Sequence, residues 1–145
     1  MKIIVVSDSH RDGETLNEIV RKTNADLYLH AGDSLVDARS LHPFISVRGN
    51  CDSYPFDLIK IIEVGKYKVY MTHGHLFSKA RMIKNAKAHG AQIVISGHTH
   101  VPSIEEIDGA FVINPGSVSY PRMDYSPTYI EIFLDDNIKI NLVKV

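Results

Sequence analysis

The sequence of 145 residues contains one cysteine and no long hydrophobic run, and each shortage excludes a class of protein. A single cysteine, Cys51, cannot form a disulfide within the chain and is compatible with a reducing compartment. No segment approaches the roughly 20 consecutive apolar residues of a membrane-spanning helix. The N-terminal apolar run is interrupted by Asp8 before it reaches the length of a signal-peptide core. We therefore expect a cytoplasmic protein with no membrane partner.

The sequence is also short of net charge, repeats and linkers. The formal net charge is -1, which gives no reason to expect nucleic acid or another polyanion as a partner. Hydrophobic residues make up 44% and charged residues 23% of the chain, the balance of a globular protein. The length fits one domain, so we expect a single domain over residues 1–145.

Histidine, by contrast, is abundant, with eight residues in the chain. Four of them form two pairs with one residue between the members, His73 with His75 and His98 with His100. Each pair directly follows a short apolar run of the kind that forms a buried strand. A strand that ends in a glycine turn would project such imidazoles at its carboxyl end, and imidazole is the commonest metal ligand in proteins.

Three further apolar runs end in residues that can ligate a metal: Asp8 and His10, Asp33, and Asn50 with Asp52. Individually, such residues often have surface or capping roles. Ligands of α/β proteins, however, gather outside the carboxyl ends of strands. Because all five clusters follow strands, we expect them to converge on one site.

The order of the predicted elements favours an α/β protein with two packed sheets flanked by helices over one open parallel sheet. Buried strands alternate with helices at first, and hairpins with glycine or Asp-Asp-Asn turns then predominate. The predicted strands cover 2–7, 26–30, 44–47, 58–64, 67–72, 92–96, 103–107, 110–114, 128–134 and 138–143, and the predicted helices 14–24, 35–41 and 78–89.

The donors of the five clusters are too numerous for one ion. One zinc ion takes about four protein ligands, or three and a water. The candidates suit two ions that share a carboxylate, about 3.5–4 Å apart, which can hold a hydroxide and a phosphoryl oxygen together. Oxygen and nitrogen donors without thiolate favour manganese, iron, nickel, cobalt or zinc over magnesium or calcium. These candidates are Asp8, His10, Asp33, Asn50, His73, His98 and His100.

The same residues carry a resemblance to a known family. Asp8-x-His10, Gly32-Asp33, Gly49-Asn50-x-Asp52, Thr72-His73-Gly74-His75 and Gly97-His98-Thr99-His100 resemble, in order, the motifs of the calcineurin-like metallophosphoesterases. Asn114-Pro115-Gly116-Ser117 and Pro121-Arg122 resemble an additional block of the small YfcE-like phosphodiesterase subgroup.

The resemblance implies a four-layer α/β/β/α sandwich with two divalent metal ions, manganese being our first expectation. One metal would take Asp8, His10 and His100, and the other would take Asn50, His73 and His98, with Asp33 bridging both. It further implies a phosphodiesterase or phosphatase in which a bridging hydroxide attacks the phosphorus of a small phosphoester in line.

Three positions allow alternative roles. Much of the family has, in place of Cys51, a histidine that helps protonate the leaving group; this cysteine is either a weaker acid or a small buried hydrophobic residue. His75 either contacts the substrate phosphate or orients a metal ligand. Arg122 either holds phosphate as a bidentate donor or forms a structural salt bridge.

A second class of function uses the same fold. The retromer scaffold subunit resembles this fold and serves mainly in protein contacts, so a metal-binding interaction scaffold is the alternative. A scaffold freed from catalysis can lose ligands, whereas this sequence keeps all seven. Apolar hairpin edges would permit a homo-oligomer.

Overall fold

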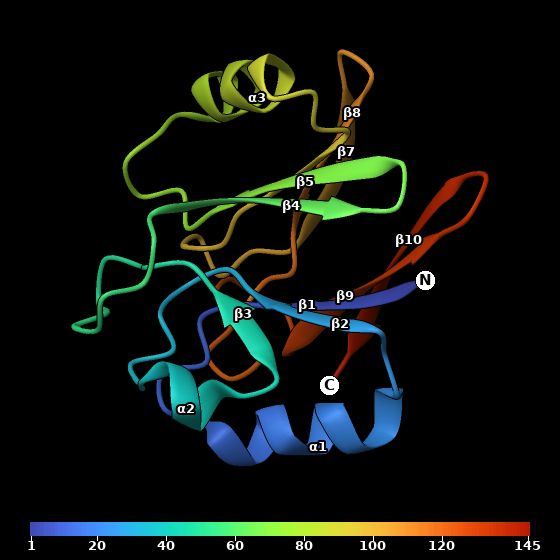
Figure 1. Cartoon of the computed structure of the whole chain (residues 1–145). Coiled ribbons are helices and arrows are strands. Elements are labelled where there is room, and N and C mark those ends of the chain that lie inside the picture. Colours follow the sequence, from blue (N-terminus) through green and yellow to red (C-terminus); the bar gives the residue numbers. More distant parts are fainter.

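The computed structural model describes residues 1–145 and contains two five-stranded sheets packed face to face (Figure 1). Helices α1 (Gly13–Thr23) and α2 (Ala38–Leu41) cover the outer face of one sheet, and α3 (Lys79–Ala88) covers the outer face of the other. The predicted two-sheet α/β architecture with flanking helices is therefore confirmed. None of the three helices has the length and apolar character that crossing a bilayer requires.

Each sheet combines parallel strands with antiparallel hairpins, one in the first sheet and two in the second. In the first sheet, β1, β2 and β3 run parallel and the hairpin β9–β10 pairs with β1. Its order is β10 (Ile138–Lys144), β9 (Thr128–Leu134), β1 (Lys2–Val6), β2 (Leu27–His30) and β3 (Phe44–Ser46). In the second sheet, β5, β6 and β8 run parallel between two antiparallel edge strands. Its order is β4 (Ile59–Val64), β5 (Tyr67–Thr72), β6 (Ile93–Ile95), β8 (Ala110–Asn114) and β7 (Ser103–Ile107).

The continuous apolar run of β1 is explained by burial on both faces of its sheet. Ile3 and Val5 belong to the core between the two sheets, whereas Ile4 and Val6 belong to the core beneath α1 and α2. A third core lies between α3 and the second sheet. Because successive side chains of a strand point to opposite faces, a strand covered on both sides must be apolar throughout.

Helix α2 is shorter than the helix predicted over 35–41. Leu35 has a φ of 63°, in the left-handed region that a right-handed helix cannot include. Its backbone N–H donates to Oδ1 of Asp52 at 2.9 Å, so the chain is held as a loop here. The helix begins only after Asp37, whose side chain caps it by accepting the N–H of Ser40.

Candidate metal centre

The parallel strands of both sheets end at one edge of the sandwich, where all five predicted clusters come together. Asp8 follows β1 and His100 follows β6, strands of different sheets, yet Oδ1 of Asp8 lies 3.2 Å from Nε2 of His100. This convergence at the carboxyl ends of strands is the placement expected from the sequence.

The backbone at this edge is unusually constrained. Five of the seven candidate ligands have φ values between 44° and 70°, a region that non-glycine residues seldom occupy. Such conformations cluster at functional sites, where the surrounding structure enforces them. The five residues are Asp8, His10, Asp33, His98 and His100.

One group of donors consists of Asp8, His10 and His100, whose ligating atoms lie within 4.8 Å of one another. Oδ1 of Asp8 and Nε2 of His10 are buried without a hydrogen-bond partner. An unsatisfied buried carboxylate oxygen is costly, because it has lost its water and gained nothing in exchange. These two atoms are therefore free to coordinate a cation.

The second group consists of Asp33, Asn50, His73 and His98. Oδ1 of Asn50 lies 3.0 Å from Nε2 of His73 and 3.0 Å from Nδ1 of His98. Oδ2 of Asp33 lies 3.3 Å from Nε2 of His73 and 3.9 Å from Nε2 of His10, and so stands between the two groups. Asp8 also approaches His73, at 3.8 Å, so the groups are contiguous.

Hydrogen bonds to the main chain orient two of the imidazoles. Nδ1 of His73 donates to the carbonyl of Ala31 at 2.7 Å, and Nδ1 of His100 donates to the carbonyl of Tyr120 at 2.6 Å. In both rings Nε2 therefore faces the carboxylates. Such contacts fix the tautomer and the ring plane of a histidine that ligates a metal.

Each carboxylate is likewise held by one oxygen and leaves the other toward the histidines. Oδ2 of Asp8 accepts the hydroxyl of Ser7 at 2.6 Å and the N–H of His98 at 3.1 Å. Oδ1 of Asp33 accepts the N–H of Cys51 at 2.9 Å. The carboxylate of Asp52 accepts three backbone N–H groups, those of Asp33, Leu35 and Gly49, and so orders the asparagine loop.

Two glycines of the motifs are required by close packing. A Cβ on Gly97 would overlap Oγ of Ser7, and a Cβ on Gly49 would overlap Oδ1 of Asp33. Each glycine thus lets one loop of the site approach the carboxylate held by another loop.

The electrostatics favour two ionised carboxylates. Burial raises the pKa of Asp8, but the close contact with His100 and the charge of His73 outweigh it and leave that pKa below its usual value. Burial likewise raises the pKa of Asp33, and contacts with His73 and the Cys51 N–H lower it well below its usual range. Burial and the neighbouring His73 lower the pKa of His98.

The three positions with alternative roles are placed as follows. Cys51 is exposed, so its interpretation as a buried packing residue is wrong. Desolvation and the charge of Asp33 raise the pKa of the Cys51 thiol.

The ring of His75 lies 5.4 Å from that of His73, and the buried Nδ1 of His75 has no hydrogen-bond partner. Arg122 is exposed and takes part in no ion pair, so the structural salt bridge is wrong as well.

Sequence reasoning did not identify Ser7 and Tyr120, which position Asp8 and His100. Ser7 is a polar residue at the end of an apolar run, directly before an aspartate, and this was the only available signal. Tyr120 contributes its carbonyl, which no side-chain pattern reveals. His30 is buried as well, with Nε2 2.9 Å from Oγ of Ser9.

Fold and motifs together define a phosphoesterase of the calcineurin type, and comparison with known proteins agrees. Residues 1–137 match the calcineurin-like phosphoesterase superfamily domain, and the chain belongs to this family. A probable metallophosphoesterase, YsnB of Bacillus subtilis, is 34% identical over 94% of this chain and 86% of its own length.

Two solved bacterial structures are similar to this chain. A predicted phosphoesterase from Streptococcus pneumoniae has a TM-score of 0.91 at 32% identity, over 99% of this chain and 88% of that one. The Escherichia coli phosphoesterase YfcE has a TM-score of 0.73 at 28% identity, over 94% of this chain and 89% of that one. The resemblance to the YfcE-like subgroup is confirmed.

The fold is shared with Vps29 as well. Vps29 of Entamoeba histolytica, solved in complex with zinc, has a TM-score of 0.75 at 20% identity, over 99% of this chain and 98% of that one. At this identity the likeness concerns the fold alone.

Proposed function

We propose that the chain is a phosphodiesterase that uses two divalent metal ions. One ion would be held by Asp8, His10 and His100, and the other by Asn50, His73 and His98, with Asp33 shared between them. The observation that carries the proposal is the pair of buried donor atoms without partners, Oδ1 of Asp8 and Nε2 of His10, beside a carboxylate that faces both groups.

The donor set fits such ions. It consists of carboxylate, amide and imidazole atoms, and no thiolate lies among them, which favours manganese, with iron, nickel, cobalt and zinc as alternatives. When bound, two such ions would supply a hydroxide for in-line attack and would offset the charge that develops on the phosphoryl oxygens. Negative charge for holding them comes from the two carboxylates whose pKa values are lowered.

The remaining residues would act on the substrate. His75, whose buried Nδ1 has no hydrogen-bond partner, would contact a phosphoryl oxygen. Burial and His73 are the main causes of the lowered pKa of His98, and the positive charge of Arg122 adds to the lowering, so this charge reaches the centre and can attract phosphate. Asn50 and Cys51 are exposed to solvent at the metal centre, which leaves room there for a small phosphoester. The preference for diesters follows the named activity of YfcE.

The alternative is a metal-binding scaffold for protein contacts, as in the retromer. The fold of Vps29 allows it, but the complete set of seven donors favours the enzyme. An exposed thiol at Cys51 supports a cytoplasmic location, where it would stay reduced.

The test is hydrolysis of bis(4-nitrophenyl) phosphate and 4-nitrophenyl phosphate by the metal-stripped protein, before and after addition of manganese, zinc, cobalt or nickel. We expect metal-dependent turnover, faster with the diester. His98→Ala and His100→Ala should each bind about one equivalent of metal less than the parent, whereas the exposed His89→Ala should bind as the parent does. No turnover with any metal, despite two bound equivalents, would favour the scaffold.

A further inference from the structure

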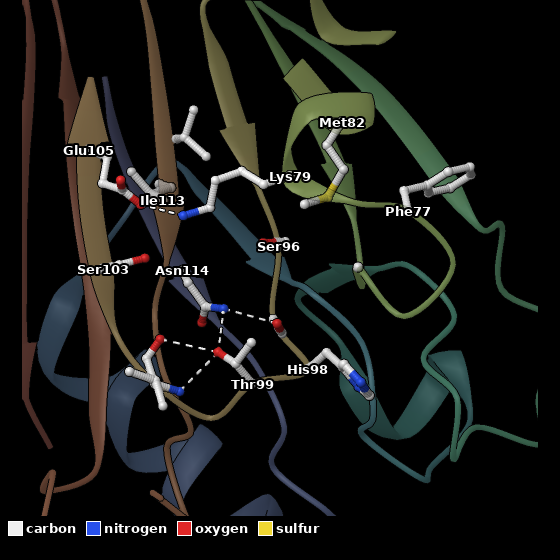
Figure 2. A pocket seen from close by; sticks show the side chains of 14 residues that line it. Phe77, Lys79, Met82, Ser96, His98, Thr99, Ser103, Glu105, Ile113 and Asn114 are labelled. Carbon is white, nitrogen blue, oxygen red and sulfur yellow. Dashed lines mark hydrogen bonds and ion pairs between the residues drawn. The ribbon is translucent and has the colours of Figure 1, made fainter. Parts of the chain in front are cut away.

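Beside the metal centre lies a cavity of about 480 Å³ between α3 and the strands β7 and β8 (Figure 2). Phe77 and Met82 line it from the side of α3, and Ser103 and Ile113 line it from the strands. Small-molecule sites typically enclose about 300–1,000 Å³. The cavity therefore has the size of a ligand site, and none of the four residues belongs to the proposed metal centre.

The cavity and the metal centre share a wall. His98 lines the cavity, and Nδ1 of the same ring lies 3.0 Å from Oδ1 of Asn50. Gly74, between His73 and His75, also lines the cavity. A phosphodiester held at the metal centre would thus have one of its two ester groups next to the cavity.

The lining carries no net charge. Apart from His98, its only acidic or basic residues are Lys79 of α3 and Glu105 of β7, and they pair with each other at 2.6 Å. Their side chains are 53% and 42% exposed, so the pair lies at the solvent side and bridges the two walls. An anionic group, such as a second phosphate, would find no unpaired cation here.

The uncharged part of the lining suits a ring-bearing group. The aromatic ring of Phe77 and the thioether of Met82 offer surfaces on which a flat ring packs well. Ser96 and Ser103 contribute hydroxyl groups that can hydrogen-bond a polar edge.

We propose that this cavity binds the organic group of the phosphodiester, and that this group is a neutral, ring-bearing alcohol of nucleoside size. The inference rests on the proposed phosphodiesterase function and adds the class of substrate. A diester with only small alkyl groups would leave the cavity unused.

Binding can be observed without turnover. The chain has four methionines, of which Met82 lines the cavity, Met71 is buried between the sheets and Met1 lies at the other end of β1. Metal-free protein labelled at the methionine methyl groups is titrated with thymidine 5′-(4-nitrophenyl phosphate). We expect a saturable shift of the Met82 resonance, with Met1 and Met71 unmoved. A Met82 resonance that stays unmoved at saturation, as judged from the exposed Met123, which follows Arg122 in the chain, overturns the proposal.

Kinetics provide the second test. Ser103→Phe fills the cavity, whereas Ile104→Phe places the same ring on the opposite, exposed face of β7. The ratio of kcat/KM for the thymidine diester to that for methyl 4-nitrophenyl phosphate should fall about tenfold or more in Ser103→Phe, mainly through KM. It should stay unchanged in Ile104→Phe.

The two proposals fail in different ways. An unchanged ratio in a folded Ser103→Phe protein, with both diesters hydrolysed, overturns the cavity assignment alone. Hydrolysis of neither diester by the parent protein with added manganese overturns the proposed function, and the Met82 titration then decides whether the cavity binds the thymidine group at all.

Discussion

The backbone N–H of His98 donates a hydrogen bond of 3.1 Å to Oδ2 of Asp8, although 90 residues separate the two in sequence. The bond joins the loop after β6 to the loop after β1, and therefore joins the two sheets at the metal centre. Ser7 donates its hydroxyl to the same oxygen at 2.6 Å. With Oδ2 fixed twice, only Oδ1 of Asp8 is left to face a cation.

Ser7→Ala should therefore weaken metal binding without removing a ligand. Loss of a hydrogen bond that orients a ligating carboxylate typically costs about 10–100-fold in affinity. We expect a loss of this size for one of two bound equivalents, measured by competition with a chelator. Ser46→Ala is the matched control, because this buried serine bonds only the neighbouring carbonyl of Val47. Equal affinities in Ser7→Ala and the parent would show that Ser7 does not position Asp8.

Asp33→Asn should be the most damaging conservative change. The amide keeps the shape of the side chain but removes the charge that would offset two cations, and its oxygen faces both His10 and His73. We expect loss of one or both metals and a fall in kcat of about a hundredfold or more. Metal content and turnover are compared with those of Asp57→Asn, an exposed aspartate. Two ions retained at parental affinity in Asp33→Asn would contradict the bridging assignment.

Much of the fold and the candidate site could be predicted because the signals are local. A strand buried on both faces must be apolar throughout, so β1, β2 and β6 are visible as short runs that end at polar residues. The turn Asp108-Gly109 likewise identifies the hairpin of β7 and β8. Since parallel strands present their carboxyl ends at one edge, the convergence of the ligands follows from their order along the chain.

The features that could not be predicted depend on contacts between distant segments. The start of α2 is set by the bond from Leu35 to Asp52, and the orientation of His100 by the carbonyl of Tyr120. The cavity beside His98 arises from the distance that packing leaves between α3 and β7. No pattern within one segment encodes such distances.

His30 should make stability depend on pH between about 4 and 6.5. Its ring is fully buried, and desolvation lowers its pKa from 6.5 to about 4, despite the nearby Asp8, Asp52 and Asp33, which raise it, while His73 adds to the lowering. Nδ1 accepts the N–H of Gly32 at 3.1 Å, so Nε2 donates to Oγ of Ser9. The neutral ring is the form that the fold accommodates.

The sign follows from proton uptake. As pH falls through 6.5, His30 takes up a proton in the unfolded chain but not in the folded chain. The stability that is present above pH 6.5 is therefore lost progressively until the pH reaches about 4. The full effect is on the order of 3 kcal/mol. His30→Asn keeps an acceptor for Gly32 and removes the titration, so its unfolding free energy should depend less steeply on pH by about 1.4 kcal/mol per unit. If the unfolding free energy of His30→Asn depends on pH as steeply as that of the parent and of the exposed His42→Asn control, His30 does not have this role.

Cys51 bears on which esters the proposed enzyme can cleave. Cys51 is an exposed residue whose sulfur accepts a hydrogen bond from Nδ2 of Asn50 at 3.4 Å, and partial desolvation and the charge of Asp33 raise the pKa of its thiol. Such a thiol stays neutral at neutral pH and is a poorer acid than an imidazolium. A positioned general acid contributes about 10²–10⁴-fold when the leaving oxygen is basic.

Turnover should therefore depend steeply on the pKa of the leaving alcohol, because nitrophenolate leaves unaided whereas an alkoxide needs a proton. Cys51→His should raise kcat for diesters of basic alcohols by about tenfold or more and change little for nitrophenyl esters. Cys51→Ala should change little for either. The measurement is kcat on a series of diesters graded by leaving-group pKa, for the parent and both variants. A flat series in the parent would mean that another group already donates the proton; His75→Gln, which removes an unpartnered ring nitrogen, would then be expected to make the series steep.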